Sequence, residues 1–161
     1  MNDVLIPILN KQYGTNYKKS DVTYWGWYKY RFTDPWAVTE TPQFWDMVDI
    51  DPIAIHIIEH LVLDGHNVRL VTASHFHPAL SHKIKTTLSL FKSNIINDEN
   101  IIIAQDKGSI IADVRIDDNP NNLFTNSCAI LFAQPWNSPE DKCDMRTSDW
   151  YRIYRYIKNM E

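Results

Sequence analysis

Two adjacent aspartates and a lysine one strand-length upstream are the residues of this sequence best suited to chemistry. Lys107 lies on a short turn, an apolar stretch follows, and Asp117 and Asp118 come where that stretch ends. Open α/β sheets bind ligands at the carboxyl ends of their strands. Carboxylate oxygens suit Mg²⁺, and a lysine adds a fixed positive charge beside them. We therefore predict a site for Mg²⁺ and a phosphorylated small molecule.

Small residues after a second apolar stretch form another candidate. Residues 68–72 are predicted to be a buried strand, followed by Thr72-Ala73-Ser74. Backbone N–H groups and a hydroxyl on such a turn can bind an anion. Taken alone, these residues are better explained by an ordinary strand-to-helix turn with a Thr or Ser cap.

A third pattern involves histidines. His56, Glu59 and His60 match the H-x-x-E-H signature of inverted zinc peptidases. The isoleucines between them give the helix its core face, and no later helix offers a third ligand. We expect these histidines to lie on the surface.

The elements that must position these residues alternate between helical and strand patterns. Asp51-Pro52 and Gly65 are expected to begin and end one helix. The strands are almost wholly apolar, which is typical of a mainly parallel sheet with both faces covered. The predicted helices span 51–65, 78–91 and 148–158, and the predicted strands span 68–72, 101–104, 113–116 and 129–132.

Composition limits the class of protein. The 161 residues, 44% of them hydrophobic and 22% charged, fit one globular domain, 1–161. A net charge of −4 argues against duplex nucleic acid as a partner. The apolar runs are shorter than the ~18 residues of a transmembrane helix, so no membrane association is expected. Two cysteines, Cys128 and Cys143, and no signal-peptide pattern favour a cytoplasmic protein.

Aromatic residues crowd into residues 24–45 and define a small helical lobe, residues 10–47. The rings can simply form the core of this lobe, because aromatic side chains bury large areas. Alternatively, Trp25, Trp27 and Tyr28 can stack on a nucleotide base.

In order along the chain, these motifs resemble the 5'(3')-deoxyribonucleotidase branch of the haloacid dehalogenase superfamily. Val68-Arg69-Leu70-Val71-Thr72-Ala73-Ser74 resembles the second motif of that family. Asp106-Lys107 and Ala112-Asp113-Val114-Arg115-Ile116-Asp117-Asp118 resemble the third and fourth. The resemblance implies a Rossmann-like three-layer α/β sandwich with a small, aromatic-rich helical cap, acting on nucleoside monophosphates with Mg²⁺.

The resemblance also implies roles for individual residues. Thr72, Ala73, Ser74 and Lys107 would bind the phosphate, with Thr72 and Lys107 serving catalysis. Asp117 and Asp118 would hold the metal, and the cap would stack on the base. An aspartate on the first strand of such enzymes attacks the phosphorus to form an aspartyl-phosphate.

The sequence departs from the family at its beginning. Met1-Asn2-Asp3-Val4-Leu5 contains no D-x-D motif, so the nucleophile and its strand are expected to be missing. In this fold that strand lies between the strands ending at Thr72 and Asp117, and its absence would leave backbone groups unpaired. A partner strand or a homo-oligomer could fill the gap. The chain is then either a truncated enzyme or an inactive relative that binds nucleotides or proteins.

Overall fold

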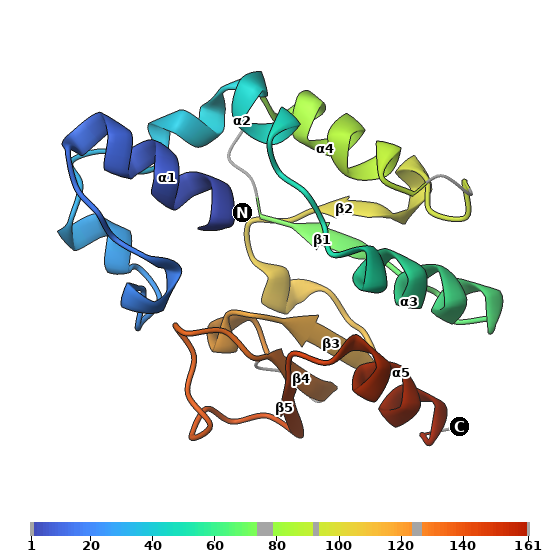
Figure 1. Cartoon of the computed structure of the whole chain (residues 1–161). Helices are drawn as coiled ribbons and strands as arrows, with labels where there is room; N and C mark the ends of the chain where they lie inside the picture. Colours follow the sequence, from blue (N-terminus) through green and yellow to red (C-terminus); the bar gives the residue numbers. More distant parts are fainter. Residues whose placement is uncertain (1, 74–78, 92–93, 124–126, 161) are drawn as a thin grey trace.

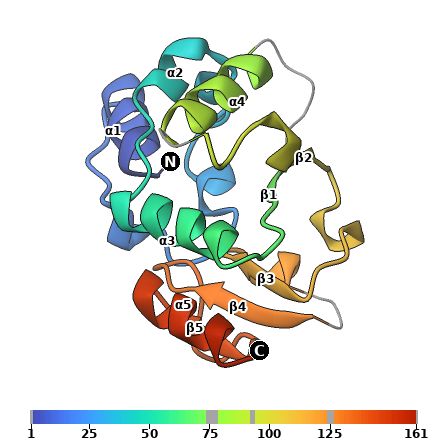
Figure 2. The same cartoon turned by 90° about the vertical axis from the view of Figure 1, so that its right-hand side faces the viewer.

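The computed structural model describes residues 2–73, 79–91, 94–123 and 127–160, and shows a mixed α/β protein (Figures 1 and 2). Ser74, which was predicted to bind phosphate, lies outside the described residues. The helices are α1 (Asn2–Tyr13), α2 (Pro42–Asp46), α3 (Pro52–Leu63), α4 (Leu80–Ser89) and α5 (Trp150–Lys158). The strands are β1 (Leu70–Thr72), β2 (Ile101–Ile103), β3 (Val114–Asp117), β4 (Cys128–Phe132) and β5 (Met145–Thr147).

The described strands are paired in parallel but form two separate sheets. β1 pairs with β2, and the second sheet has the order β3-β4-β5 (Figure 1). The parallel pairing confirms the prediction. Strand β5 was not predicted, because its three residues include the charged Arg146 and carry no apolar run.

Helix α3 shows how closely local sequence fixes an element. The Asp51 carboxylate caps it by accepting a hydrogen bond from the Ile53 N–H at 2.9 Å, and Pro52 occupies the first turn. Gly65 has φ +96°, a left-handed conformation that favours glycine. The His66 N–H donates to the Leu61 carbonyl oxygen at 3.0 Å and closes the helix end. The predicted bounds of this helix are confirmed.

The side chains of α3 and α5 form one core with the second sheet. Ile57 and Leu61 of α3 and Ile153 of α5 cluster with Ile130 of β4 and Met145 of β5. A second core fills the aromatic lobe and includes α1 residues such as Leu5 and Leu9. Helix α3 follows this lobe in sequence, so it connects the aromatic lobe to the second sheet.

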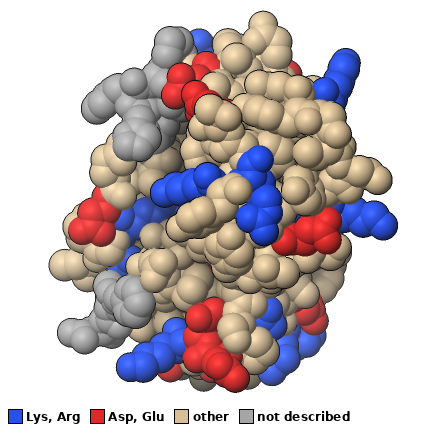
Figure 3. Space-filling model, turned by 90° about the vertical axis from the view of Figure 1, so that its left-hand side faces the viewer, with Lys and Arg blue, Asp and Glu red and all other residues tan. Residues whose placement is uncertain are grey.

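The surface carries charges of both signs. Lysines, arginines and acidic residues are interspersed on the face shown in Figure 3. Within the described ranges, none of the helices combines the length and the apolar character needed to span a membrane.

We predict that Ile130→Ala lowers the free energy of unfolding by about 2 to 5 kcal/mol, because the deletion leaves a cavity in a packed core. Ile130 is 0% exposed at the centre of the second sheet. The control is Ile111→Ala, since Ile111 is 99% exposed; its effect should stay within about 0.5 kcal/mol. Urea unfolding followed by circular dichroism measures both. If the two substitutions lowered the free energy of unfolding equally, the core around β4 would not be what stabilises the fold.

Candidate functional site

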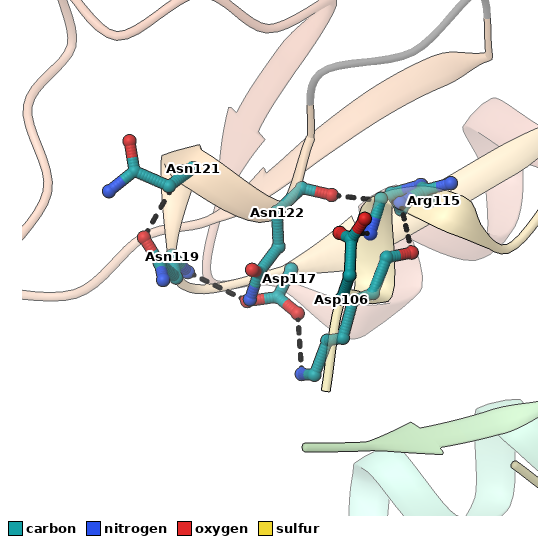
Figure 4. Close-up of polar contacts among 8 residues, drawn as sticks. Asp106, Arg115, Asp117, Asn119, Asn121 and Asn122 are labelled. Carbon is teal, nitrogen blue, oxygen red and sulfur yellow. Dashed lines mark hydrogen bonds and ion pairs between the residues drawn. The ribbon is translucent and has the colours of Figure 1, made fainter. Parts of the chain in front are cut away.

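The carboxylate of Asp117, at the end of β3, is held from two sides. Its Oδ2 accepts a hydrogen bond from Lys107 Nζ at 2.9 Å, and the pair is largely buried. Its Oδ1 accepts from the Asn119 N–H at 2.8 Å and from Asn122 Nδ2 at 3.0 Å. The lysine and aspartate that the sequence analysis selected therefore meet in the folded chain (Figure 4).

Two short 3₁₀ helices place the groups that hold Asp117. Lys107 begins η5 (Lys107–Ser109), which Asp106 caps by accepting from the Gly108 N–H at 2.8 Å. Asn122 ends η6 (Pro120–Asn122), which Asn119 caps through the Asn121 N–H at 3.1 Å. Aspartate and asparagine suit these positions because their short side chains reach the backbone two residues ahead.

A cavity of about 770 Å³ separates the two sheets and contains most of the candidate phosphate site. Thr72 at the end of β1, Lys107, and Asp117 at the end of β3 all line it. Its walls also include Ile58 of α3 and Ile157 of α5. Thr72 and Lys107, two of the four residues predicted to bind phosphate, thus face one space between the edges of β1 and β3. Ala73 is exposed and is not among the lining residues.

A second lysine, which the sequence analysis did not select, lines the same cavity. Lys83 of α4 places its Nζ 4.6 Å from the centre of the Trp45 ring. Burial and the nearby charge of Lys107 lower the pKa of Lys83. Two lysines whose charges repel each other favour an anion between them. The sequence could have indicated this lysine by its position, because Lys83 precedes the inward-facing Ile84 in an amphipathic helix.

Asp118 faces a different cavity from its neighbour Asp117. It lines a space of about 340 Å³ between the aromatic lobe and the carboxyl end of the second sheet. Burial, and secondly the charge of Asp117, raise the pKa of Asp118 to about 6. The Asp118 carbonyl oxygen accepts from Nδ2 of the buried Asn137 at 2.8 Å, which fixes the backbone at this point.

This second cavity has aromatic walls. Trp25, which is 50% exposed, and Tyr28 line it together with Trp136. Trp27 does not line it; its ring packs edge-on against Tyr17 and Tyr28 inside the lobe. The structure therefore brings two of the three predicted stacking residues to a common cavity.

The residues at the end of β3 fit a magnesium ion. Mg²⁺ is usually bound by one or two carboxylates, with water and substrate phosphate completing its shell. Asp117 and Asp118 provide that number of carboxylates at the end of β3.

The zinc pattern is incomplete. The rings of His56 and His60 lie 4.3 Å apart. Within the part of the chain that the structure describes, no three His, Cys, Asp or Glu residues are grouped so as to hold a metal.

Comparison with known proteins gives two matches. Residues 2–160 match the model of a family described as "5' nucleotidase, deoxy (Pyrimidine), cytosolic type C protein". A 5'(3')-deoxyribonucleotidase from Clostridium acetobutylicum is 29% identical over 125 residues, which span 77% of this chain and 67% of that protein.

We predict a pH-dependent gain of stability for Asp118→Asn. The pKa of Asp118, raised from 3.8 to about 6, means that the folded protein holds this proton more tightly than the unfolded chain. Stability therefore falls as pH rises from about 4 to 6 and stays lowered above that range. Removing the charge should stabilise the protein at pH 8 by roughly 1 to 3 kcal/mol and have little effect at pH 3.5.

Thermal unfolding in a chelating buffer measures this difference. Asp34→Asn, at an exposed position, is the control and should behave alike at both pH values. A gain for Asp118→Asn that is equal at pH 3.5 and pH 8 would contradict the assigned titration.

Proposed function

Because this chain belongs to the family of deoxy (pyrimidine) cytosolic type C 5' nucleotidases, we propose that it forms the core of a Mg²⁺-dependent phosphohydrolase acting on deoxyribonucleoside monophosphates. The observation that carries the proposal is the grouping of Thr72, Lys83, Lys107 and Asp117 around one cavity. The family description also supports a cytoplasmic location, which we propose for this chain.

The phosphate group is bound where the cavity meets the ends of β1 and β3. Lys107 and Lys83 neutralise its oxygens, and a bound dianion offsets the burial and the repulsion from Lys107 that together lower the pKa of Lys83. The Thr72 hydroxyl donates a hydrogen bond from the opposite strand. These groups act mainly by electrostatic stabilisation, which is the principal demand of phosphoryl transfer.

Asp117 and Asp118 would hold the magnesium ion. When bound, the ion supplies positive charge to the phosphate oxygens during in-line displacement. Asn119 and Asn122 keep the Asp117 carboxylate in one orientation, and Asn137 holds the backbone of Asp118. The two carboxylates thus reach the ion from a rigid turn.

The nucleophile is delivered by an additional strand placed between β1 and β3. Asp117, which pairs with Lys107, and Asp113, at the other end of β3, are the described carboxylates that line the cavity. Asp3 lines the other cavity, where it pairs with Lys19 at 3.0 Å. A parallel strand in the gap would pair with the free edges of β1 and β3 and bring a carboxylate to Lys107.

The nucleoside occupies the aromatic cavity. Trp25, which is half exposed, offers its ring to a base, the buried Tyr28 forms part of the wall behind it, and Asp118 lines the same cavity. Base–aromatic contacts of this kind contribute about 1 to 3 kcal/mol each.

The first experiment measures phosphate release from dTMP and dUMP with Mg²⁺, for this chain and for a longer version extended at its N-terminus. We expect release by a longer version in which the added residues form a strand between β1 and β3. Lys107→Ala and Asp117→Asn in that version should each lower kcat by about 100-fold or more. Full activity in either variant would remove the site assignment.

The second experiment isolates Lys83. Lys83→Met should weaken binding of inorganic phosphate, measured by calorimetry with Mg²⁺, by about tenfold, because a charge-assisted hydrogen bond is lost. Lys85→Met is the matched control, since Lys85 is exposed on the same helix α4. An equal effect of the two substitutions would show that Lys83 does not contact the anion.

A catalytically inactive nucleotide-binding relative is the second candidate function. The ion pair between Lys107 and Asp117 favours this alternative, because the Asp117 carboxylate is already bound to Lys107. Under this alternative, neither version of the chain releases phosphate, while dTMP still raises the melting temperature.

A further inference from the structure

We propose that Arg115, a residue of β3, is a positioning residue that fixes the geometry of the Lys107–Asp117 ion pair. The inference rests on the proposed function, because it concerns how the phosphate site is kept in shape. Arg115 and Asp117 are two residues apart on one strand, so their side chains leave the same face of the sheet. Arg115 is thus directed to the side of β3 on which the site is built.

The guanidinium of Arg115 joins the two turns that hold Asp117. Its Nη1 donates to the Lys107 carbonyl oxygen at 2.8 Å and to the Asn122 carbonyl oxygen at 3.0 Å. Its Nη2 donates to the Ile110 carbonyl oxygen, at the end of η5. A single side chain therefore binds both ends of the lysine turn and the end of η6. Figure 4 shows the hydrogen bond that joins Arg115 to Asn122.

These contacts close a ring of interactions around the site. Arg115 holds the backbone of Lys107 and of Asn122, and the side chains of these two residues hold opposite oxygens of Asp117. The separation of the two turns is then fixed by a rigid, planar group rather than by the ligand. A site organised in this way is ready for phosphate before phosphate arrives.

The contacts of Arg115 suit positioning better than ion pairing. Among the described residues, no salt bridge involves Arg115, and its Nη atoms bind carbonyl oxygens. A lysine would keep the charge, but its single ammonium lacks the planar fork that spans three carbonyl groups. Charge alone should therefore not replace Arg115.

The test compares Arg115→Lys and Arg115→Met with the unaltered chain. Arg69→Met is the matched control, because Arg69 lines the same cavity and also donates to a turn carbonyl, but to that of Glu99 rather than to the turns that hold Asp117. Calorimetry with inorganic phosphate and Mg²⁺ measures binding, and thermal unfolding confirms that each variant is folded. We expect both Arg115 variants to bind phosphate about 10- to 100-fold more weakly, as for other residues that orient a ligand-binding group.

A spectroscopic readout separates positioning from general stability. The ¹⁵N signal of the Lys107 ammonium, assigned by its absence in Lys107→Met, should be sharp in the unaltered chain because Asp117 binds it. It should broaden or disappear in Arg115→Lys and persist in Arg69→Met. If Arg115→Met does not fold, Arg115→Lys decides the result.

The outcomes are distinguishable. Phosphate binding within about twofold of the unaltered chain in a folded Arg115→Lys variant, together with a retained Lys107 signal, would overturn the positioning role. Absence of phosphate binding by the unaltered chain would instead refute the proposed function. The Lys107 signal then still decides whether Arg115 positions the pair.

Discussion

The buried ion pair between Lys107 and Asp117 is the interaction on which the arrangement of the site depends. Removing two charges from water is costly, and their attraction offsets that cost only with good geometry and further hydrogen bonds. Here the distance is 2.9 Å, and Asn119 and Asn122 donate to the remaining carboxylate oxygen. The ion pair therefore requires η5 and η6 to keep fixed positions relative to the end of β3. The side-chain caps of the two 3₁₀ helices and the hydrogen bonds of Arg115 hold them there.

The division of the strands into two sheets explains where the cavity lies. Parallel strands with apolar side chains are normally paired on both edges and covered on both faces. In the described chain, β1 and β3 each pair on one edge only, and the 770 Å³ cavity lies between them. Residues of α3, α4 and α5 also line this space. The cavity is surrounded by the kind of apolar side chains that normally cover a buried strand. Where β1 and β3 end, it is lined by charged groups suited to an anion.

Much of the local structure could be predicted from sequence, because it depends on residues near one another in the chain. Asp51 and Gly65 marked the ends of α3, and the position of Asp117 after an apolar run placed it at the carboxyl edge of a sheet. The parallel pairing followed from the uniformly apolar strands. Strand β5 was missed because three residues around Arg146 give no periodic signal.

The parts of the site that sequence could not provide depend on tertiary packing. The inward direction of Lys83 is set by the approach of α4 to α2, where its ammonium lies over Trp45. Arg115 stands inside an otherwise apolar strand, and its partners are backbone carbonyls, which no residue pattern reveals. Trp27, Trp25 and Tyr28 are alike in sequence, but only packing decides which rings face a cavity.

The twin aspartates illustrate this limit and also connect the two cavities. Asp117 is the last residue of β3 and Asp118 begins the turn that follows, and the two line different cavities: Asp117 faces the lysines while Asp118 faces the aromatic walls. The charge of Asp117 nevertheless contributes to the raised pKa of Asp118, which shows that the two carboxylates remain close. A cation bound by both would relieve this repulsion and lie between the lysine-lined space and the ring-lined space. A molecule with a phosphate at one end and a flat ring at the other matches that order of charge and apolar surface.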